Sequence, residues 1–110
     1  MTNVRPPAHL APATRKWFAS VVAQFQLEDH HVRLLILAAE AWDRVQEARA
    51  AIAQHGMVFQ DRFGAPRLRP EVAVERDSRI AFVRILRELG LDAVEPDGPR
   101  PPPLRGQRGG

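Results

Sequence analysis

The fold is decided by residues 28–56, which read EDHHVRLLILAAEAWDRVQEARAAIAQHG. Apolar residues recur in this stretch at alternating intervals of three and four, a spacing typical of one face of an α-helix. The stripe consists of Leu34 or Leu35, Ala38, Trp42, Val45, Ala48 and Ile52. Glu28 and Asp29 suit a helix N-terminus, and Gly56 suits its end. We therefore predict a helix over about 28–54, roughly 40 Å long at 1.5 Å per residue.

Two further helices and a hairpin are predicted around this long central helix. The first helix spans about residues 12 or 13 to 26, because Trp17, Val21 and Phe25 follow a helical spacing. The third spans 70–89, with a proline at its start, Gly90 after its end, and a buried face. That face consists of Phe82, Ile85, Leu86 and Leu89. Residues 57–69 read as a small β-hairpin with its turn at Phe63 and Gly64.

The expected fold class is therefore mainly α, with three segments along the chain. Residues 1–12 form an irregular N-terminal lead, and residues 13–91 form the helical domain. In residues 92–110, nine of nineteen residues are proline or glycine. Such a segment cannot bury enough apolar surface to offset its ordering entropy, so we expect a disordered tail.

Composition excludes several classes of protein. The 110 residues include no cysteine, which removes disulfides, thiolate metal sites and cysteine nucleophiles, and favours a reducing cytoplasm. No apolar run approaches the 18 or so residues that a membrane span needs. We expect an intracellular protein without membrane contact.

Positive charge gathers in two places. Residues 1–26 contain Arg5, Arg15 and Lys16 and no acidic residue, and residues 57–69 carry three arginines against one acid. These hairpin arginines are Arg62, Arg67 and Arg69. Such patches suit nucleic acid or an acidic partner surface. Both sets are candidate DNA-binding residues, and a merely solvated surface is the alternative for each.

The sequence contains no convincing set of catalytic residues. Glu40, Asp43 and Glu47 line one flank of the central helix, but arginines lie among them. We interpret this flank as a solvated or intersubunit ion-pair face rather than a catalytic acid pair. His30 and His31 are adjacent and point about 100° apart on a helix, which makes them poor joint metal ligands. We predict no catalytic site, no metal and no cofactor.

The central helix is too long for a small domain to cover. Folds of this size are commonly completed by oligomerisation. We predict a homo-oligomer larger than a dimer, in which part of the apolar stripe contacts neighbouring subunits. The predicted interface residues are Leu35, Trp42, Val45 and Ile52. The alternative is a helix that its own neighbours cover completely.

The order of several residues resembles a known family. These residues are Trp17-Phe18, Leu34-Leu35, Ala39-Glu40, Trp42-Asp43-Arg44, Ile52, Gly56, Phe63-Gly64, Pro70 and Glu88-Leu89-Gly90-Leu91. In this order and spacing the chain resembles the phage terminase small subunit of the P27 type, over about residues 5–91. Members often carry histidine before the proline of the third helix, where this chain has Arg69. The resemblance implies a non-catalytic, ring-forming DNA-packaging subunit. Such a subunit recognises double-stranded viral DNA in the host cytoplasm and passes it to the terminase large subunit, which holds the ATPase and nuclease.

Two other functions stay open on the residues alone. A short break at Gln26 and Leu27 joins the first two helices, which is the connectivity of a helix-turn-helix. A dimeric transcriptional regulator of that kind is one alternative, and Trp17 and Trp42 could then stack on bases or pack in the core. A non-nucleic-acid adaptor, whose proline- and arginine-rich tail binds a partner, is the other. Many subunits would favour packaging, and two would favour a regulator.

Overall fold

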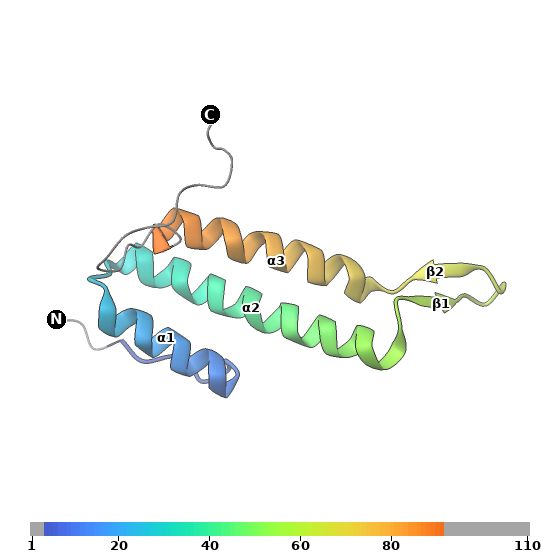
Figure 1. The fold of residues 1–110 in the computed structure, drawn as a ribbon, viewed down its shortest axis with the longest axis horizontal. Coiled ribbons are helices and arrows are strands. Elements are labelled where there is room, and N and C mark those ends of the chain that lie inside the picture. The colour runs from blue at the N-terminus through green and yellow to red at the C-terminus, as the bar shows by residue number, and fades with distance from the viewer. Residues whose placement is uncertain (1–3, 92–110) are drawn as a thin grey trace, which may run out of the picture.

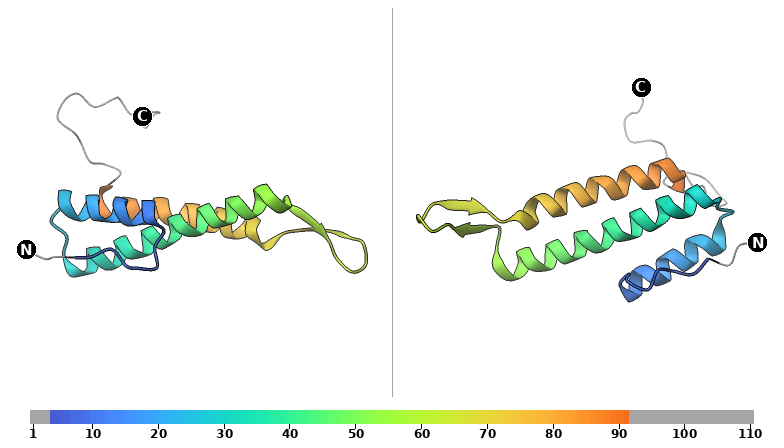
Figure 2. Two further views of the ribbon diagram at one scale, coloured as in Figure 1. Left: turned by 90° about the horizontal axis from the view of Figure 1, so that it is seen from below. Right: turned by 180° about the vertical axis from the view of Figure 1, so that it is seen from behind.

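Three helices and one hairpin make up the computed structural model, which describes residues 4–91 (Figure 1). The elements are α1 (Pro12–Gln24), α2 (Asp29–His55), β1 (Val58–Gln60), β2 (Pro66–Leu68) and α3 (Pro70–Leu89). α2 and α3 run antiparallel side by side, α1 packs on the first half of α2, and the hairpin projects from the opposite end (Figures 1 and 2). The expected fold class is confirmed. The predicted disordered tail, residues 92–110, lies outside the described residues.

Proline, glycine and a capping box set the helix ends. The Glu28 side chain accepts a hydrogen bond from the backbone N–H of His31, and His31 Nδ1 accepts one from the Glu28 N–H at 3.1 Å. Gly56 and Gly90 end α2 and α3 with φ of 82° and 76°, values that favour glycine. α1 ends at Gln24, two residues earlier than predicted, because Phe25 is already extended.

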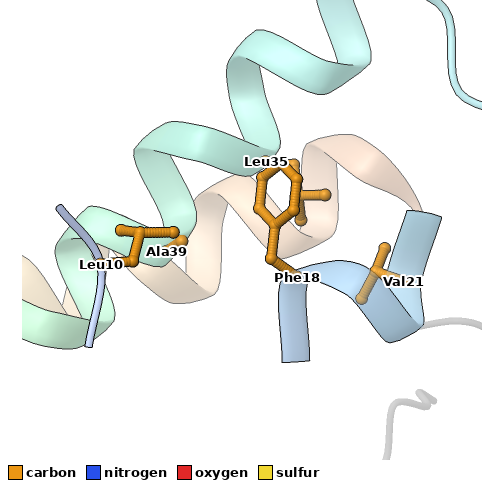
Figure 3. Close-up of a cluster of buried hydrophobic side chains, with 5 residues drawn as sticks. All are labelled: Leu10, Phe18, Val21, Leu35 and Ala39. Carbon is orange, nitrogen blue, oxygen red and sulfur yellow. The ribbon is translucent and has the colours of Figure 1, made fainter. Parts of the chain in front are cut away.

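The core lies where α1 packs on the first half of α2 (Figure 3). Phe18 and Val21 of α1 meet Leu35 and Ala39 of α2, and Leu10 of the N-terminal lead closes the cluster. Phe18 and Leu35 are fully buried. The second half of α2 extends beyond α1, so this core serves only one end of the molecule.

The buried face predicted for α3 is only partly covered. No residue of α3 is buried, and Phe82, Ile85, Leu86 and Leu89 are each half-buried. The prediction of a buried face was wrong in degree, because α2 is the one helix that packs along most of α3 (Figure 2). Leu89, at the end of α3, packs against the core cluster.

Asp43 is the buried polar anchor of this fold. Its side chain is only 5% exposed and accepts two hydrogen bonds, from the Ala11 backbone N–H at 2.9 Å and from the Thr14 hydroxyl at 2.5 Å. Both donors lie at the N-terminus of α1, where the helix dipole also favours a negative charge. The carboxylate therefore fixes the start of α1 to the middle of α2.

This finding corrects the interpretation of the acidic flank. The expected solvated or intersubunit face was wrong for Asp43, because the N-terminal lead and α1 fold back over that part of α2. Glu40 lies beside His9, with 2.7 Å between Oε2 and Nε2. Glu47 is 66% exposed and pairs with Arg44 at 2.8 Å, so only this member fits the expectation of a solvated ion pair.

Large apolar side chains remain exposed on the single chain. On α2 and α3 these are Leu37, Trp42, Val74, Ile80 and Val83. On and beside the hairpin they are Met57, Val58, Phe59, Phe63 and Leu68. Part of the apolar surface is thus left uncovered, as expected for a long helix in a small domain.

Replacing Asp43 with Ala should destabilise the protein, because the Ala11 N–H and the Thr14 hydroxyl lose their acceptor in a buried site. We expect the free energy of unfolding to fall by about 1–3 kcal/mol. Urea denaturation at fixed protein concentration, followed by circular dichroism, measures the change. Glu47→Ala is the control and should cost about 0.5 kcal/mol or less. Equal losses in the two variants would contradict the anchoring role of Asp43.

Candidate nucleic-acid interface

Arg15 and Lys16 lie together on the exposed surface of α1, just after its first turn. Among residues 4–91, no carboxylate is within ion-pair distance of either side chain. The first turn of α1 contains no acidic residue. Their two charges are therefore available to an external anion.

Arg5 does not join this pair. The adjacent Val4 lines a surface pocket with residues 22–27, at the C-terminal end of α1. Arg15 and Lys16 lie near the other end of the helix, because the N-terminal lead runs back alongside α1 (Figure 1). The three cations predicted as one set are thus split between two ends of one helix.

The hairpin arginines are mostly paired with acids. Arg67 Nε lies 3.0 Å from Asp61, and Arg69 Nε lies 3.2 Å from Glu71. Arg62 stacks over the Phe63 ring, with 5.0 Å from its guanidinium carbon to the ring centroid. Of the three predicted cations, Arg62 is the one without a carboxylate partner in the described part of the chain.

Asp61 organises the hairpin turn. Its Oδ1 accepts hydrogen bonds from the Phe63 N–H at 2.8 Å and the Ala65 N–H at 3.0 Å. The Ala65 N–H and the Arg67 guanidinium lower the pKa of Asp61. Gly64 takes a φ of 81°, which places the turn at Phe63 and Gly64 as the sequence indicated. The strands pair antiparallel, with Val58 opposite Leu68.

Other arginines are held by acids of the helical pair. Arg49 of α2 and Arg79 of α3 both contact Glu75 Oε2, at 3.1 and 3.2 Å. Glu75 is only 15% exposed, and Arg79 and then Arg49 lower its pKa. This shared carboxylate links α2 to α3. Its arginines, unlike Arg15 and Lys16, are engaged within the chain.

An aromatic cavity lies where α1, α2 and α3 meet. Trp17, Trp42 and Phe82 come from three different helices, with ring centroids 5.9 Å apart for Trp17–Phe82 and 5.2 Å apart for Trp42–Phe82. With Ala13 and Thr14 they line a cavity of about 280 Å³. Sequence reasoning missed this cavity, because each aromatic residue by itself fits an apolar helix face.

The predicted interface residues differ in exposure. Leu35 and Val45 lie in the core of the single chain, so their side chains have no surface to offer a second subunit. Trp42 is 41% exposed and Ile52 is half-buried. Of these four residues, only Trp42 and Ile52 can therefore contact a neighbouring subunit.

No group of three or more His, Asp or Glu side chains in residues 4–91 is placed to hold a metal ion. No helix in that range is long and apolar enough to cross a membrane.

The family follows from comparison with known proteins. A family model described as the phage terminase small subunit matches residues 15–96. The chain belongs to this family. The resemblance seen in the order of its residues is thereby confirmed, and membership assigns the chain a role in phage DNA packaging. The match begins at Arg15 and includes α2, the hairpin and α3. No curated protein and no solved structure matches the chain.

The Glu75 link predicts a specific dependence of stability on pH. Because the pKa of Glu75 in the folded state is below its unfolded value of about 4.3, its carboxylate stabilises the fold above that pH. The contribution is lost as the pH falls through the folded pKa. Urea denaturation near neutral pH should show Glu75→Gln less stable than wild type, with the difference vanishing in strong acid. A difference that stayed constant with pH would contradict the link.

Proposed function

We propose that this chain binds double-stranded viral DNA through α1 and presents it to the terminase large subunit. It acts in the host cytoplasm as a non-catalytic, cofactor-free component, and the ATPase and nuclease reside in the large subunit. The observation that carries the proposal is the unpaired, exposed Arg15 and Lys16 on a segment without acids. Arginines that already pair with a carboxylate, such as Arg67 and Arg69, are less available to bind phosphate than Arg15 and Lys16.

The expected contact is with phosphates rather than base edges. Lysine and arginine bind the DNA backbone by charge, which fixes position without reading sequence. Each neutralised phosphate releases a counterion, so the binding weakens as salt rises. Two cations per subunit give weak binding by one chain.

Assembly would convert this weak site into an effective one. The proposed form is a closed homo-oligomer larger than a dimer, whose contacts use Trp42 and Ile52 together with exposed apolar residues of α3 such as Ile80 and Val83. A ring repeats Arg15 and Lys16 once per subunit. Multivalent binding then raises the affinity without any new type of contact.

The geometry argues against a helix-turn-helix regulator. A recognition helix places its N-terminal residues in the major groove. α2 instead lies between α1 and α3 and begins with Glu28 and Asp29, whose carboxylates would repel phosphates (Figure 1). The short break between α1 and α2 therefore serves packing rather than groove insertion.

DNA titration tests the proposed function. The variant R15E/K16E should bind labelled duplex DNA much more weakly than wild type at low salt. The dependence on salt should also weaken, by about one unit of the log–log slope for each phosphate that the variant no longer neutralises. R84E/R87E is the matched control, since it makes the same change in net charge on α3 and should retain more binding.

The hairpin provides the competing site in this experiment. Loss of binding in Arg62→Glu with unchanged binding in R15E/K16E would move the DNA contact to the hairpin and contradict our assignment. Absence of binding by the wild type at low salt would contradict DNA recognition itself and favour the adaptor function.

A further inference from the structure

The aromatic cavity has room for one aromatic ring from outside the subunit. Its volume is about 280 Å³, and an apolar cavity of about 150 Å³ is enough to hold benzene. The rings of Trp17, Trp42 and Phe82 line the cavity, and the exposed face of Trp42 leaves it open to solvent. Aromatic rings attract one another in offset and edge-to-face arrangements. A ring of the size of benzene therefore fits this cavity in both volume and chemistry.

The same chain presents such a ring at the tip of its hairpin. Phe63 is 80% exposed, more than any other large apolar side chain in residues 4–91. Asp61 Oδ1 accepts hydrogen bonds from the Phe63 and Ala65 N–H groups, and Gly64 takes the left-handed conformation, so the turn holds Phe63 in place. A side chain on a backbone that is already ordered loses less freedom on binding. Phe63 thus has the form of an anchor residue.

Phe63 lies far from the cavity of its own subunit. About 20 Å of helix separates Trp42 from the end of α2 at His55, and a similar length separates Phe82 from the start of α3 at Pro70. The hairpin then continues away from the helical pair (Figures 1 and 2). The ring and the cavity can therefore meet only between two copies of the chain.

The symmetry of such a contact matches the proposed assembly. The surface that gives Phe63 differs from the surface that receives it, so each copy can give its hairpin to one neighbour and receive one from another. Contacts between unlike surfaces can close into rings, whereas a contact between identical surfaces forms a dimer. A homo-oligomer larger than a dimer, with the symmetry of a ring, needs a contact of the first kind.

Charge also favours this contact. Arg62 stacks over the Phe63 ring and has no carboxylate partner in the described part of the chain. It reaches the cavity together with Phe63, where the faces of the tryptophan rings attract a cation. The Asp43 carboxylate, held by two neutral donors, lies directly behind Thr14 in the cavity wall. This attraction opposes the repulsion from the exposed cations of α1.

We propose that Phe63 of one subunit inserts into the aromatic cavity of the next, against the exposed face of Trp42. Burial of one phenylalanine covers about 150–250 Å², whereas a stable interface covers about 800 Å² on each partner. Phe63 is therefore the anchor of a larger contact, which the exposed apolar residues of α2 and α3 complete. The inference rests on the homo-oligomer of the proposed function and names the surfaces that form it.

Dilution of the full-length protein tests the anchor. The variant F63A should keep its fold, because Phe63 is exposed, and should dissociate at a concentration at least about 30-fold higher than wild type, the effect of removing an aromatic hot spot. Phe59→Ala is the matched control, since it makes the same change in the same hairpin away from its tip, and it should assemble like wild type. Mass photometry over a dilution series measures both.

Tryptophan fluorescence reports the cavity itself. The chain has two tryptophans, Trp17 and Trp42, and both line the cavity. Assembled wild type should emit at shorter wavelength and resist acrylamide quenching more than its diluted, dissociated form. F63A should keep the emission of the dissociated form at every concentration.

A mixing experiment tests the pairing of unlike surfaces. F63A keeps the cavity and lacks the anchor, whereas Ala13→Phe keeps the anchor and fills the cavity from its wall. Neither variant should assemble alone at the concentration where wild type does. Their mixture should form a complex of one copy of each that grows no further, which native mass spectrometry resolves.

Three results would overturn the proposal and leave the homo-oligomer and DNA binding in place. The first is F63A with the dissociation and emission of wild type, and the second is equal weakening in F63A and F59A. The third is weaker assembly of F63A with unchanged emission, which would place Phe63 elsewhere in the interface. A wild type that stays monomeric would instead contradict the assembly in the proposed function, and this contact with it.

Discussion

The buried carboxylate of Asp43 is the interaction on which this fold depends. It receives the Ala11 N–H and the Thr14 hydroxyl in a site that is closed to water, and so fixes where α1 begins on α2. Each oxygen of this buried carboxylate accepts one of these hydrogen bonds. The pair favours one arrangement, because a shift of α1 would leave a buried polar group without its partner. With α1 held there, Phe18 meets Leu35, while Arg15 and Lys16 stay on the outer surface.

Because α1 packs only on the first half of α2, the rest of α2 and most of α3 pack against few other elements. α2 and α3 support each other, and Glu75 links them through Arg49 and Arg79. Yet α3 has no buried residue, and the hairpin presents Phe63 with 80% of its surface exposed. Exposed apolar surface on this scale is typical of a protein that meets a partner. This exposed apolar surface supports the proposed homo-oligomer.

Local signals made most of the fold predictable. Pro70 and Gly90 defined α3 to the residue, because a proline start and a left-handed glycine end are local backbone constraints. The role of Asp43 was not predictable, since it depends on which segment folds over the middle of α2. The number of unpaired cations on the hairpin was overestimated for a similar reason. Arg67 and Arg69 form ion pairs that only the folded geometry reveals. Of the predicted DNA-binding set, Arg15 and Lys16 stayed together, whereas Arg5 lies toward the other end of α1.

The central claim is that one chain is an incomplete unit, finished by copies of itself. The native mass of the full-length protein at micromolar concentration tests this claim most directly. Our account predicts one discrete species whose mass is a fixed multiple of the chain mass and exceeds that of a dimer. A monodisperse monomer would show that the exposed faces of α2 and α3 need no second copy, and would contradict the account. A stable dimer would contradict the ring.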